Sequence, residues 1–385
     1  MKKRVLILGI DGYLGWSLAL YLINRGFRVS GCDNLLRRKL VYREKSISAT
    51  PIKSWANRYT ILSGMSDQES VFKRIDITDY SDLKRMLELT EPDAIVHFAQ
   101  MPSAPYSMKG IEEATLTYKN NLIGNLNLIF AMREVCPNAH LVKLGTMGEY
   151  GTPDIDISEG DFEVKFNGRK DMLPFPRQPG SFYHCTKVHD STNIRMACKF
   201  WKLRVTDIMQ GVVFGIKIPE MKDSEELLTR YDFDECFGTA INRFCAQAAV
   251  GLPITPYGKG GQNRGFLPLR DSMRCIELII RKPAKKGEHR IINQFENVYN
   301  LFALALIVES KAKELGLDAR VVPVKNPRIE LEDHYYNPVH EKLVALGYKP
   351  TVAIEDEVGV MIESLLPYKD RILRCKEAIE PKTKW

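Results

Sequence analysis

The chain has 385 residues and a net charge of +7, with 44% hydrophobic and 27% charged residues. These values are typical of a globular protein with one main domain and a smaller companion. No long run of like charges and no apolar run of about 18 residues is present, which argues against nucleic-acid binding and membrane insertion. The eight cysteines are scattered without metal-binding spacing, and the N-terminus enters an apolar strand directly. We therefore expect a cytoplasmic protein without disulfides, metal or targeting peptide.

The first predicted elements form a dinucleotide site. An apolar strand over 3–8 leads into the loop Gly9-Ile10-Asp11-Gly12-Tyr13-Leu14-Gly15, and an apolar-periodic helix follows. Such glycines permit a tight turn and let a pyrophosphate approach the helix N-terminus. A second strand ends at Asp33, where an acidic side chain is expected to bind the adenosine ribose. Asp33 favours NAD over NADP, although Arg37 and Arg38 are of the type that accommodates a 2′-phosphate.

Strands and helices alternate through the first half of the chain. We predict strands over 71–76, 93–98 and 140–144 and a long helix over 120–136. This order predicts an α/β fold with a doubly wound parallel (Rossmann) sheet. The segment 38–71 is long and irregular and is either an inserted element or an interaction arm. Further residues expected beside the cofactor follow these strands or begin the helix, namely Asn34, Asp76, Ile77, Ala99 and Asn120.

A tyrosine and a lysine on one helix face are the candidate catalytic pair. Tyr183 and Lys187 are four residues apart, so the ammonium can favour a phenolate whose unperturbed pKa is about 10. Alone, such a pair more often only shares a helix face. The strand over 140–144, however, leads to Thr146, whose hydroxyl is expected at the ligand-binding edge of the sheet. Together with the glycine loop and Asp33, Thr146 makes the catalytic interpretation the better one.

In this order, the motifs resemble those of the extended short-chain dehydrogenase/reductase superfamily. Longer stretches resemble the UDP-sulfoquinovose synthase family, and they cover nearly the whole chain: 33–38, 103–108, 141–153, 181–184, 187–191, 237–240, 242–245 and 334–337. The resemblance implies an NAD-dependent enzyme, formally grouped with hydrolases acting on C–S bonds, that joins sulfite to UDP-glucose. It also implies a route: oxidation at C4, loss of the C6 hydroxyl, addition of sulfite at C6 and re-reduction at C4. Tyr183 would be the base, Thr146 would orient the C4 hydroxyl, and Lys187 would also hold the nicotinamide ribose.

The base for the C5 proton is left open. Sugar 4,6-dehydratases carry Thr-Asp-Glu at this strand end, whereas Met147 and Gly148 follow Thr146 here. The alternatives are Tyr183 acting again, Glu149 and His184. Glu149 equally fits a structural residue that points away from the site. His184, if protonated, would attract sulfite, but a histidine satisfied by the backbone explains the position as well.

One departure from the plant-type enzymes concerns sulfite. Where those enzymes carry Gln-Arg before Ser-Ala-Pro, this chain has Met101-Pro102. The missing arginine would be a natural contact for an anion. The way in which sulfite is delivered is therefore in question.

The second half of the chain is expected to hold the nucleotide sugar. A strand over 204–209 leads to Gln210 and Val213, which the resemblance places beside the nicotinamide, Gln210 also being near the substrate. Thr239 and Asn242 open a helix whose N-terminus suits a phosphate. Ordinary capping by Thr239 explains the same pattern.

Arginines follow in and after a glycine-rich turn at 256–266 that also carries Tyr257. Arg264 resembles the position that clamps the UDP diphosphate across the superfamily, and guanidinium geometry matches phosphate. Arg328 is a second candidate for the same diphosphate. Arg270-Asp271 is expected to be a structural pair.

These patterns predict two domains and a homodimer. Residues 1–215 form the NAD-binding domain, to which parts of 265–300 return, and 216–385 form mainly the nucleotide-sugar lobe, with helices near 301–315 and 355–366. The rival interpretations are a UDP-sugar 4-epimerase or 4,6-dehydratase and, from another class, a non-catalytic NAD-binding sensor. Met147-Gly148 argues against the dehydratase, and the long motif matches argue against the epimerase. The intact Thr146, Tyr183 and Lys187 argue against the sensor.

Overall fold

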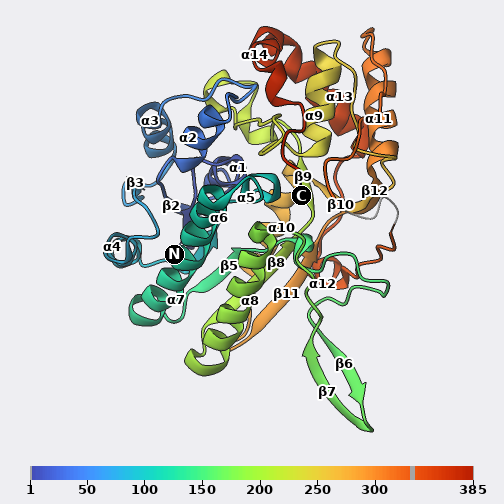
Figure 1. The fold of residues 1–385 in the computed structure, drawn as a ribbon. Helices are drawn as coiled ribbons and strands as arrows, with labels where there is room; N and C mark the ends of the chain where they lie inside the picture. The colour runs from blue at the N-terminus through green and yellow to red at the C-terminus, as the bar shows by residue number, and fades with distance from the viewer. Residues whose placement is uncertain (1, 330–333, 385) are drawn as a thin grey trace.

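The computed structural model describes residues 2–329 and 334–384. A parallel sheet with strand order β11-β8-β5-β4-β1-β2-β3 forms its centre, as predicted (Figure 1). The order reverses between β1 and β4, and ligands of such sheets bind outside the carboxyl ends of the strands at this point. The strands are β1 (Arg4–Leu8), β2 (Arg28–Asp33), β3 (Phe72–Arg74), β4 (Ala94–His97), β5 (His140–Leu144), β8 (Arg204–Gln210) and β11 (His289–Gln294).

Helices cover both faces of this sheet because its strands carry apolar side chains on both faces. In β1, Val5 and Ile7 pack toward one layer of helices, and Leu6 and Leu8 pack toward the other. The first layer contains α1 (Tyr13–Ile23), α3 (Trp55–Met65) and α10 (Leu269–Arg281). The second contains α4 (Tyr80–Thr90), α7 (Gly124–Val135) and α8 (Phe182–Trp201).

The helix predicted over 120–136 begins earlier than expected. Helix α6 (Ile111–Tyr118) continues through a π-helical turn, Lys119–Ile123, into α7. Asn121 in this turn is buried, and its side chain bonds the backbone of Met101 and the hydroxyl of Thr186. A π-helical turn inside an α-helix is frequent at functional sites. The Asn-Asn pair therefore lies inside the helix and does not begin it.

The segment 38–71 is an inserted part of the fold and not a projecting arm. It contains α2 (Leu36–Arg43) and α3, and α3 packs against α1 through Leu62. Ser54 caps α3 by accepting a hydrogen bond from the backbone of Asn57. The prediction of an irregular segment was thus wrong, because a short helix with weak apolar periodicity gives little signal.

A second lobe stands above the carboxyl edge of the main sheet (Figure 1). It has a small sheet of β9 (Val212–Phe214), β10 (Asn263–Pro268) and β12 (Asn297–Asn300), with α9, α11 and α13 packed on it. The helices α9, α11 and α13 span Ala240–Ala249, Leu301–Glu314 and Ile354–Leu365, respectively. The chain also has three short helices: α5 (Ala104–Ser107), which contacts α6 and α8, α12 (Glu341–Ala345), which contacts β11, and α14 (Lys369–Arg374), which packs on this lobe. The domain boundary at 215 stays a prediction, and β11 lies in the main sheet.

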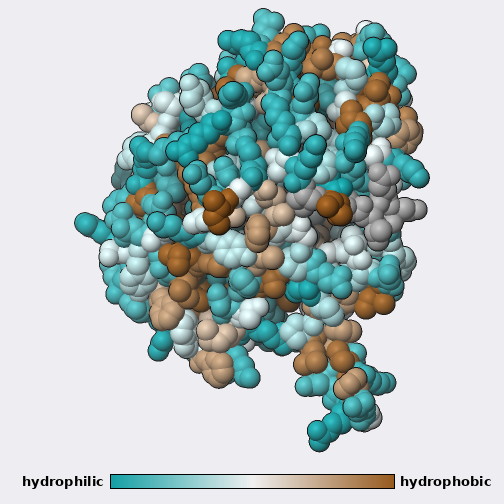
Figure 2. Space-filling view, in the orientation of Figure 1, coloured by the Kyte–Doolittle hydropathy of each residue, from teal (hydrophilic) through white to brown (hydrophobic). Residues whose placement is uncertain are grey.

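A hairpin of β6 (Asp161–Phe166) and β7 (Arg169–Pro174) projects from the body (Figure 1), and no sequence signal had been assigned to it. Its base is tied to α8 by an ion pair between Arg195 and Asp161 at 2.7 Å. Elsewhere on the same face, hydrophilic side chains predominate and hydrophobic ones form small separate patches (Figure 2). None of the helices in the described ranges is long and apolar enough to cross a membrane.

Candidate active site

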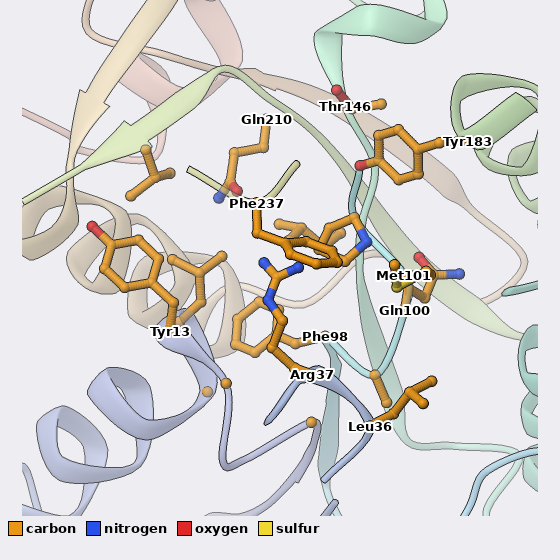
Figure 3. A pocket seen from close by; sticks show the side chains of 18 of the residues that line it. Tyr13, Leu36, Arg37, Phe98, Gln100, Met101, Thr146, Tyr183, Gln210 and Phe237 are labelled. Carbon is orange, nitrogen blue, oxygen red and sulfur yellow. The ribbon is translucent and has the colours of Figure 1, made fainter. Parts of the chain in front are cut away.

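A cavity of about 400 Å³ lies at the carboxyl ends of the central strands, between the sheet and the second lobe. Figure 3 shows Tyr13, Arg37, Gln210, Thr146 and Tyr183 around it. It collects side chains from segments that are far apart in the sequence. The lining residues that the sequence had predicted are Gly9, Gly12, Tyr13, Leu14, Gly15, Asp33, Asn34, Arg37, Ile77, Ala99, Asn120, Thr146, Tyr183, His184, Gln210, Val213, Thr239 and Asn242.

The glycine loop is packed so closely that side chains would not fit. A Cβ on Gly15 would lie 2.0 Å from the carbonyl oxygen of Gly9, and a Cβ on Gly9 would lie 2.8 Å from the backbone nitrogen of Ala99. Gly9 also has a φ of +86°, which glycine adopts without strain. The loop therefore brings bare backbone against the cavity, as dinucleotide binding requires.

Asp33 ends β2 beside this loop. Its carboxylate accepts hydrogen bonds from the backbone nitrogens of Asp11 at 3.0 Å and Leu35 at 2.7 Å. Burial and the nearby Asp11 raise the pKa of Asp33 to about 6. The carboxylate is thus held at the cavity wall with lone pairs remaining for ribose hydroxyls.

Three side chains predicted to contact the cofactor have other partners. The carboxylate of Asp11 binds Arg38, at 2.6 Å, and Arg58, at 3.0 Å, and neither Asp11 nor Arg38 lines the cavity. Asp76 accepts hydrogen bonds from Asn34 and Thr78 and also lies outside the lining. In this structure nearby donors and an arginine from the insertion hold these side chains outside the lining, and their contact with the cofactor stays a prediction.

Tyr183 lies beside Thr146 on the cavity wall (Figure 3). Burial raises the pKa of its hydroxyl well above the ordinary value, and Glu149 adds to this rise. Arg37 and a hydrogen bond with Thr146 act in the opposite direction. In this structure desolvation of the charged form outweighs the nearby cations, and the activation of Tyr183 by Lys187 stays a prediction.

Lys187 is buried behind Tyr183 and does not line the cavity. Its ammonium donates to the carbonyl of Leu144 at 2.6 Å and to the side chain of Gln100, which in turn donates to Asp190. Burial and the like charge of Lys143 lower the pKa of Lys187 to about 7. Sequence reasoning missed Gln100, whose only signal was its place directly after the end of a strand.

Glu149 is placed as a structural residue. Its side chain is fully buried 3.5 Å from Lys143, it accepts a hydrogen bond from Ser191, and it lies outside the cavity lining. The chain makes a single 3₁₀ turn, Met147–Glu149, after β5, and this turn directs the carboxylate into the core. This placement supports the structural interpretation of Glu149, and its catalytic role stays an untested prediction.

His184 lines the cavity but is not protonated. Its Nδ1 contacts the hydroxyl of Ser181 at 3.0 Å. Burial, together with the charges of Arg328 and Arg264, lowers its pKa to about 3. This direction opposes a cationic His184, and the attraction of sulfite by His184 stays a prediction. A Cβ on Gly148 would lie 2.3 Å from its Nε2, so the ring fills the space beside Gly148.

The predicted nucleotide-sugar residues divide into two groups. Thr239 and Asn242 line the cavity, and the Thr239 hydroxyl also caps α9 by accepting from the backbone of Asn242 at 3.3 Å. Tyr257, Arg264 and Arg328 lie outside the lining, in an arginine cluster near His184.

Arg243 also belongs to this arginine cluster, and sequence reasoning did not single it out as a site residue although it lies in the stretch 242–245. It donates to the Tyr257 hydroxyl at 2.7 Å and stacks on the Tyr257 ring at 4.2 Å. Arg328 lies 6.0 Å from the same ring. Arg264 donates to the carbonyl of Asn263 and contacts the ring of His334 at 3.1 Å.

The expected pair Arg270-Asp271 does not form. Arg270 instead binds Glu357 at 2.7 Å, across the lobe. Asp271 accepts hydrogen bonds from Thr351 and Tyr348. Adjacent residues on a helix point in different directions, so both find partners in the second lobe.

Comparison with known proteins identifies the family. The NAD dependent epimerase/dehydratase family matches residues 5–294. The chain is 46% identical to the chloroplastic UDP-sulfoquinovose synthase of Spinacia oleracea, over 100% of this chain and 79% of that protein. It is also 46% identical to the UDP-sulfoquinovose synthase of Sulfolobus acidocaldarius, over 99% of this chain and 97% of that protein.

Solved structures agree on the fold. The NAD complex of Thermus thermophilus UDP-glucose 4-epimerase has a TM-score of 0.67 at 21% identity, covering 94% of this chain and 98% of that chain. A Bacillus cereus UDP-glucuronic acid 4-epimerase variant bound to NAD has a TM-score of 0.69 at 20% identity, covering 95% and 99%. At these identities the likeness concerns the fold alone. The chain has a glycine loop of the dinucleotide-binding type and is 46% identical to two UDP-sulfoquinovose synthases over nearly its whole length. It therefore belongs to the UDP-sulfoquinovose synthases within the NAD dependent epimerase/dehydratase family.

Proposed function

We propose that this chain is an NAD-dependent UDP-sulfoquinovose synthase. It converts UDP-glucose and bisulfite into UDP-6-sulfo-6-deoxyglucose and water. The observation that carries the proposal is the meeting of Thr146, Tyr183 and the glycine loop at one cavity. Full-length identity of 46% to proteins of that name supports the choice of reaction.

The first step is oxidation of the sugar at C4. When bound here, NAD would supply the hydride acceptor for oxidation at C4 and the hydride donor for the final reduction, so that no net oxidation would result. The residues suited to hold it are the glycine loop, Asp33, Asn34 and Asn120, with Arg37 near its charged part. Tyr183 acts as the base in its ionised form: the phenol first releases its own proton to solvent, and the phenolate then takes the proton of the C4 hydroxyl, which Thr146 orients. Arg37 and Thr146 are the groups that favour this ionised form.

Elimination and addition follow at C5 and C6. The 4-keto group acidifies the C5–H bond, a base removes this proton, and the C6 hydroxyl leaves and is protonated to water. The sulfur of sulfite then forms a bond to C6, and C5 regains a proton. With Glu149 buried beneath the site, Tyr183 and His184 remain as bases. The lowered pKa keeps His184 uncharged but also makes it a weak base at neutral pH, so it would act only with an anionic substrate beside it that raises this pKa.

The arginine cluster around Tyr257 is proposed to hold the UDP. Arg243, Arg264 and Arg328 collect positive charge around Tyr257, on the side of His184. A diphosphate is the ligand whose oxygens such guanidinium groups match. Gln210, whose amide bonds Gln294 at 2.7 Å, is held at the cavity wall between the nicotinamide and sugar positions.

Incubation with UDP-glucose and sulfite tests this function. Mass spectrometry of the products should detect a UDP-sugar sulfonate, and the absorbance of reduced nicotinamide should return to its starting value. UDP-galactose as the only product would instead support a 4-epimerase. A purified, NAD-loaded protein without turnover on any UDP-hexose would support the sensor.

A homodimer is proposed on an exposed apolar face of the helices α7 and α8. A cluster of exposed apolar side chains lies on these helices and the turn before α7: Ile123, Leu126, Phe130, Phe182, Met196 and Phe200. Exposed apolar clusters of this kind mark interfaces. Light scattering should give twice the mass of the chain for the wild type and the mass of a single chain for Phe200→Glu. A cytoplasmic location remains our prediction.

A further inference from the structure

We propose that two segments, 46–58 of the insertion and 227–237 of the second lobe, form a clamp that retains bound NAD. The proposal rests on the NAD dependence of the family and not on the identity of the sugar. An enzyme whose cofactor is reduced and reoxidised within one turnover benefits when that cofactor dissociates slowly. The clamp residues come from parts of the chain that no cofactor motif includes.

The insertion is tied to the glycine loop by a buried arginine. Arg58 donates to the carbonyl and the carboxylate of Asp11 at 2.9 and 3.0 Å, and stacks on Trp16 at 4.2 Å. Its other guanidinium nitrogen donates to the carbonyl of Leu228 at 3.0 Å. One side chain thus joins the cofactor loop, the insertion and the segment 227–237.

Backbone contacts join the two clamp segments directly. The Thr50 hydroxyl donates to the carbonyl of Thr229 at 2.7 Å, and the backbone nitrogen of Ala49 donates to the carbonyl of Tyr231 at 2.9 Å. In return, the nitrogen of Tyr231 donates to the hydroxyl of Ser48 at 2.9 Å. These contacts are buried, so water does not compete with them.

The clamp is also bonded to the glycine loop itself. The hydroxyl of Thr229 donates to the carbonyl of Tyr13 at 2.9 Å, and the indole of Trp16 donates to the carbonyl of Leu227 at 2.7 Å. Tyr13, whose carbonyl accepts, and Trp16, whose indole donates, both lie at the start of α1, where the pyrophosphate is expected. Displacement of the segment 227–237 would break these bonds as well.

The clamp meets the cavity at an ion pair. Arg37 follows β2 on the cofactor side, Asp232 lies in the clamp, and their side chains are 3.2 Å apart. Both line the cavity, as does Phe237, on whose ring Arg37 stacks at 4.1 Å (Figure 3). The two walls of the cavity are thus connected across it, and a cofactor on the glycine loop leaves only after this connection opens.

The test uses residues that do not line the cavity, so that lost cofactor contacts do not explain the result. Thr50→Val removes the hydroxyl that binds Thr229 and keeps the shape of the side chain. Arg58→Lys replaces the guanidinium group, which bonds both Asp11 of the glycine loop and Leu228 of the segment 227–237, with a single ammonium group. Arg195→Gln, which breaks an ion pair at the base of the hairpin, is the matched control. NAD remaining on the purified holoenzyme is measured over time by rapid gel filtration without substrate.

We expect NAD to dissociate about five times faster from Thr50→Val, as for the loss of one net hydrogen bond of about 1 kcal/mol. Arg58→Lys should accelerate dissociation more than tenfold, and Arg195→Gln should match the wild type. Hydrogen exchange should show that NAD increases protection in 227–237. If folded Thr50→Val and wild-type protein lose NAD equally fast, the clamp is wrong, even where Arg58→Lys fails to fold. Because no sugar is present, this outcome would leave the proposed sulfite reaction unaffected.

Discussion

Two groups of buried charge lie near the cavity, and they differ in how their charge is balanced. Beneath the carboxyl end of β5, Lys143 lies 3.5 Å from Glu149 and 3.1 Å from Asp207, and all three side chains are fully buried. In the arginine cluster, Arg243 is also buried, but its hydrogen bonds are to the hydroxyl of Tyr257 and the carbonyl of Thr255. Within the described ranges no carboxylate forms an ion pair with Arg243.

This difference separates a supporting structure from a binding surface. In the first group Arg177 also lies 4.0 Å from Glu149, so two cations face two carboxylates. This balanced group holds β5, β8 and α8 in place and leaves no charge for a ligand. In the second group the charge of Arg243 is kept beside the site, where an anionic substrate is expected. Substitutions in the first group should reduce stability, and substitutions in the second should reduce substrate affinity.

The largest effect is expected at Tyr183, which neither group contacts directly. Tyr183→Phe removes the proton acceptor for C4, and general acid–base groups contribute about 10²–10⁴-fold to rates. Reduction of bound NAD by UDP-glucose, followed by absorbance, should slow by this factor, with NAD content unchanged. Tyr59→Phe, at an exposed position, is the control. Reduction at the wild-type rate would remove Tyr183 from the proposed role.

The self-neutralising group should carry stability. Asp207→Asn leaves Lys143 without its nearer carboxylate, and breaking a buried ion pair costs about 3–5 kcal/mol. The free energy of unfolding in urea measures this loss. Asp161→Asn breaks the partly exposed ion pair with Arg195 and should cost less than about 1 kcal/mol. Equal losses in the two variants would contradict the distinction between the groups.

The same carboxylate predicts a pH dependence of stability. Burial alone would raise the pKa of Asp207, but Lys143 and His289 outweigh it and keep this pKa below the ordinary value. The folded state therefore binds fewer protons than the unfolded chain, whose aspartates titrate near about 3.9. The stability from Asp207 should be complete above that pH and be lost as the pH falls below it. The difference in stability between wild type and Asp207→Asn should shrink accordingly.

The sequence predicted the parts of the site that depend on local backbone geometry. The glycine loop, Asp33, Thr146 and Tyr183 follow strands or lie on a helix at short, fixed spacing, so a linear pattern is sufficient to locate them. Glu149 had the same local signal, yet its direction depends on Lys143 and Ser191. Ser191 lies on α8 and is 42 positions away in the chain.

Residues brought in from distant segments were not predictable. Arg58 reaches Asp11 from an insertion, and Asp232 reaches Arg37 from the second lobe. Nothing in the local sequence distinguishes Arg243 from a surface arginine, because its contact with Tyr257 depends on how α9 packs. The effect of burial on the pKa of His184 and Tyr183 was not predictable either, because no spacing in the sequence reveals how far a group is desolvated.

The arginine cluster should determine substrate affinity. Arg243→Gln keeps a polar side chain but removes the charge, and a hydrogen bond to a charged group contributes about 1.5–3 kcal/mol. We therefore expect the KM for UDP-glucose to rise about 10- to 100-fold with a smaller change in kcat. Arg281→Gln, at an exposed position on α10, is the control. A fall in kcat at unchanged KM would instead assign Arg243 to the chemistry.

The smallest effect is expected at Gly148, between the two charge groups. A Cβ there would lie 2.3 Å from Nε2 and 2.6 Å from Cδ2 of His184, so the ring must move. Overpacking of this kind costs about 1–3 kcal/mol. Gly180→Ala is a matched control, since nothing lies within 4 Å of its added Cβ. If His184 serves as the C5 base, Gly148→Ala should slow the release of deuterium from C5-labelled UDP-glucose more than it slows reduction of bound NAD at C4. An equal effect on both steps would leave the C5 proton to Tyr183, because both steps would then share one base.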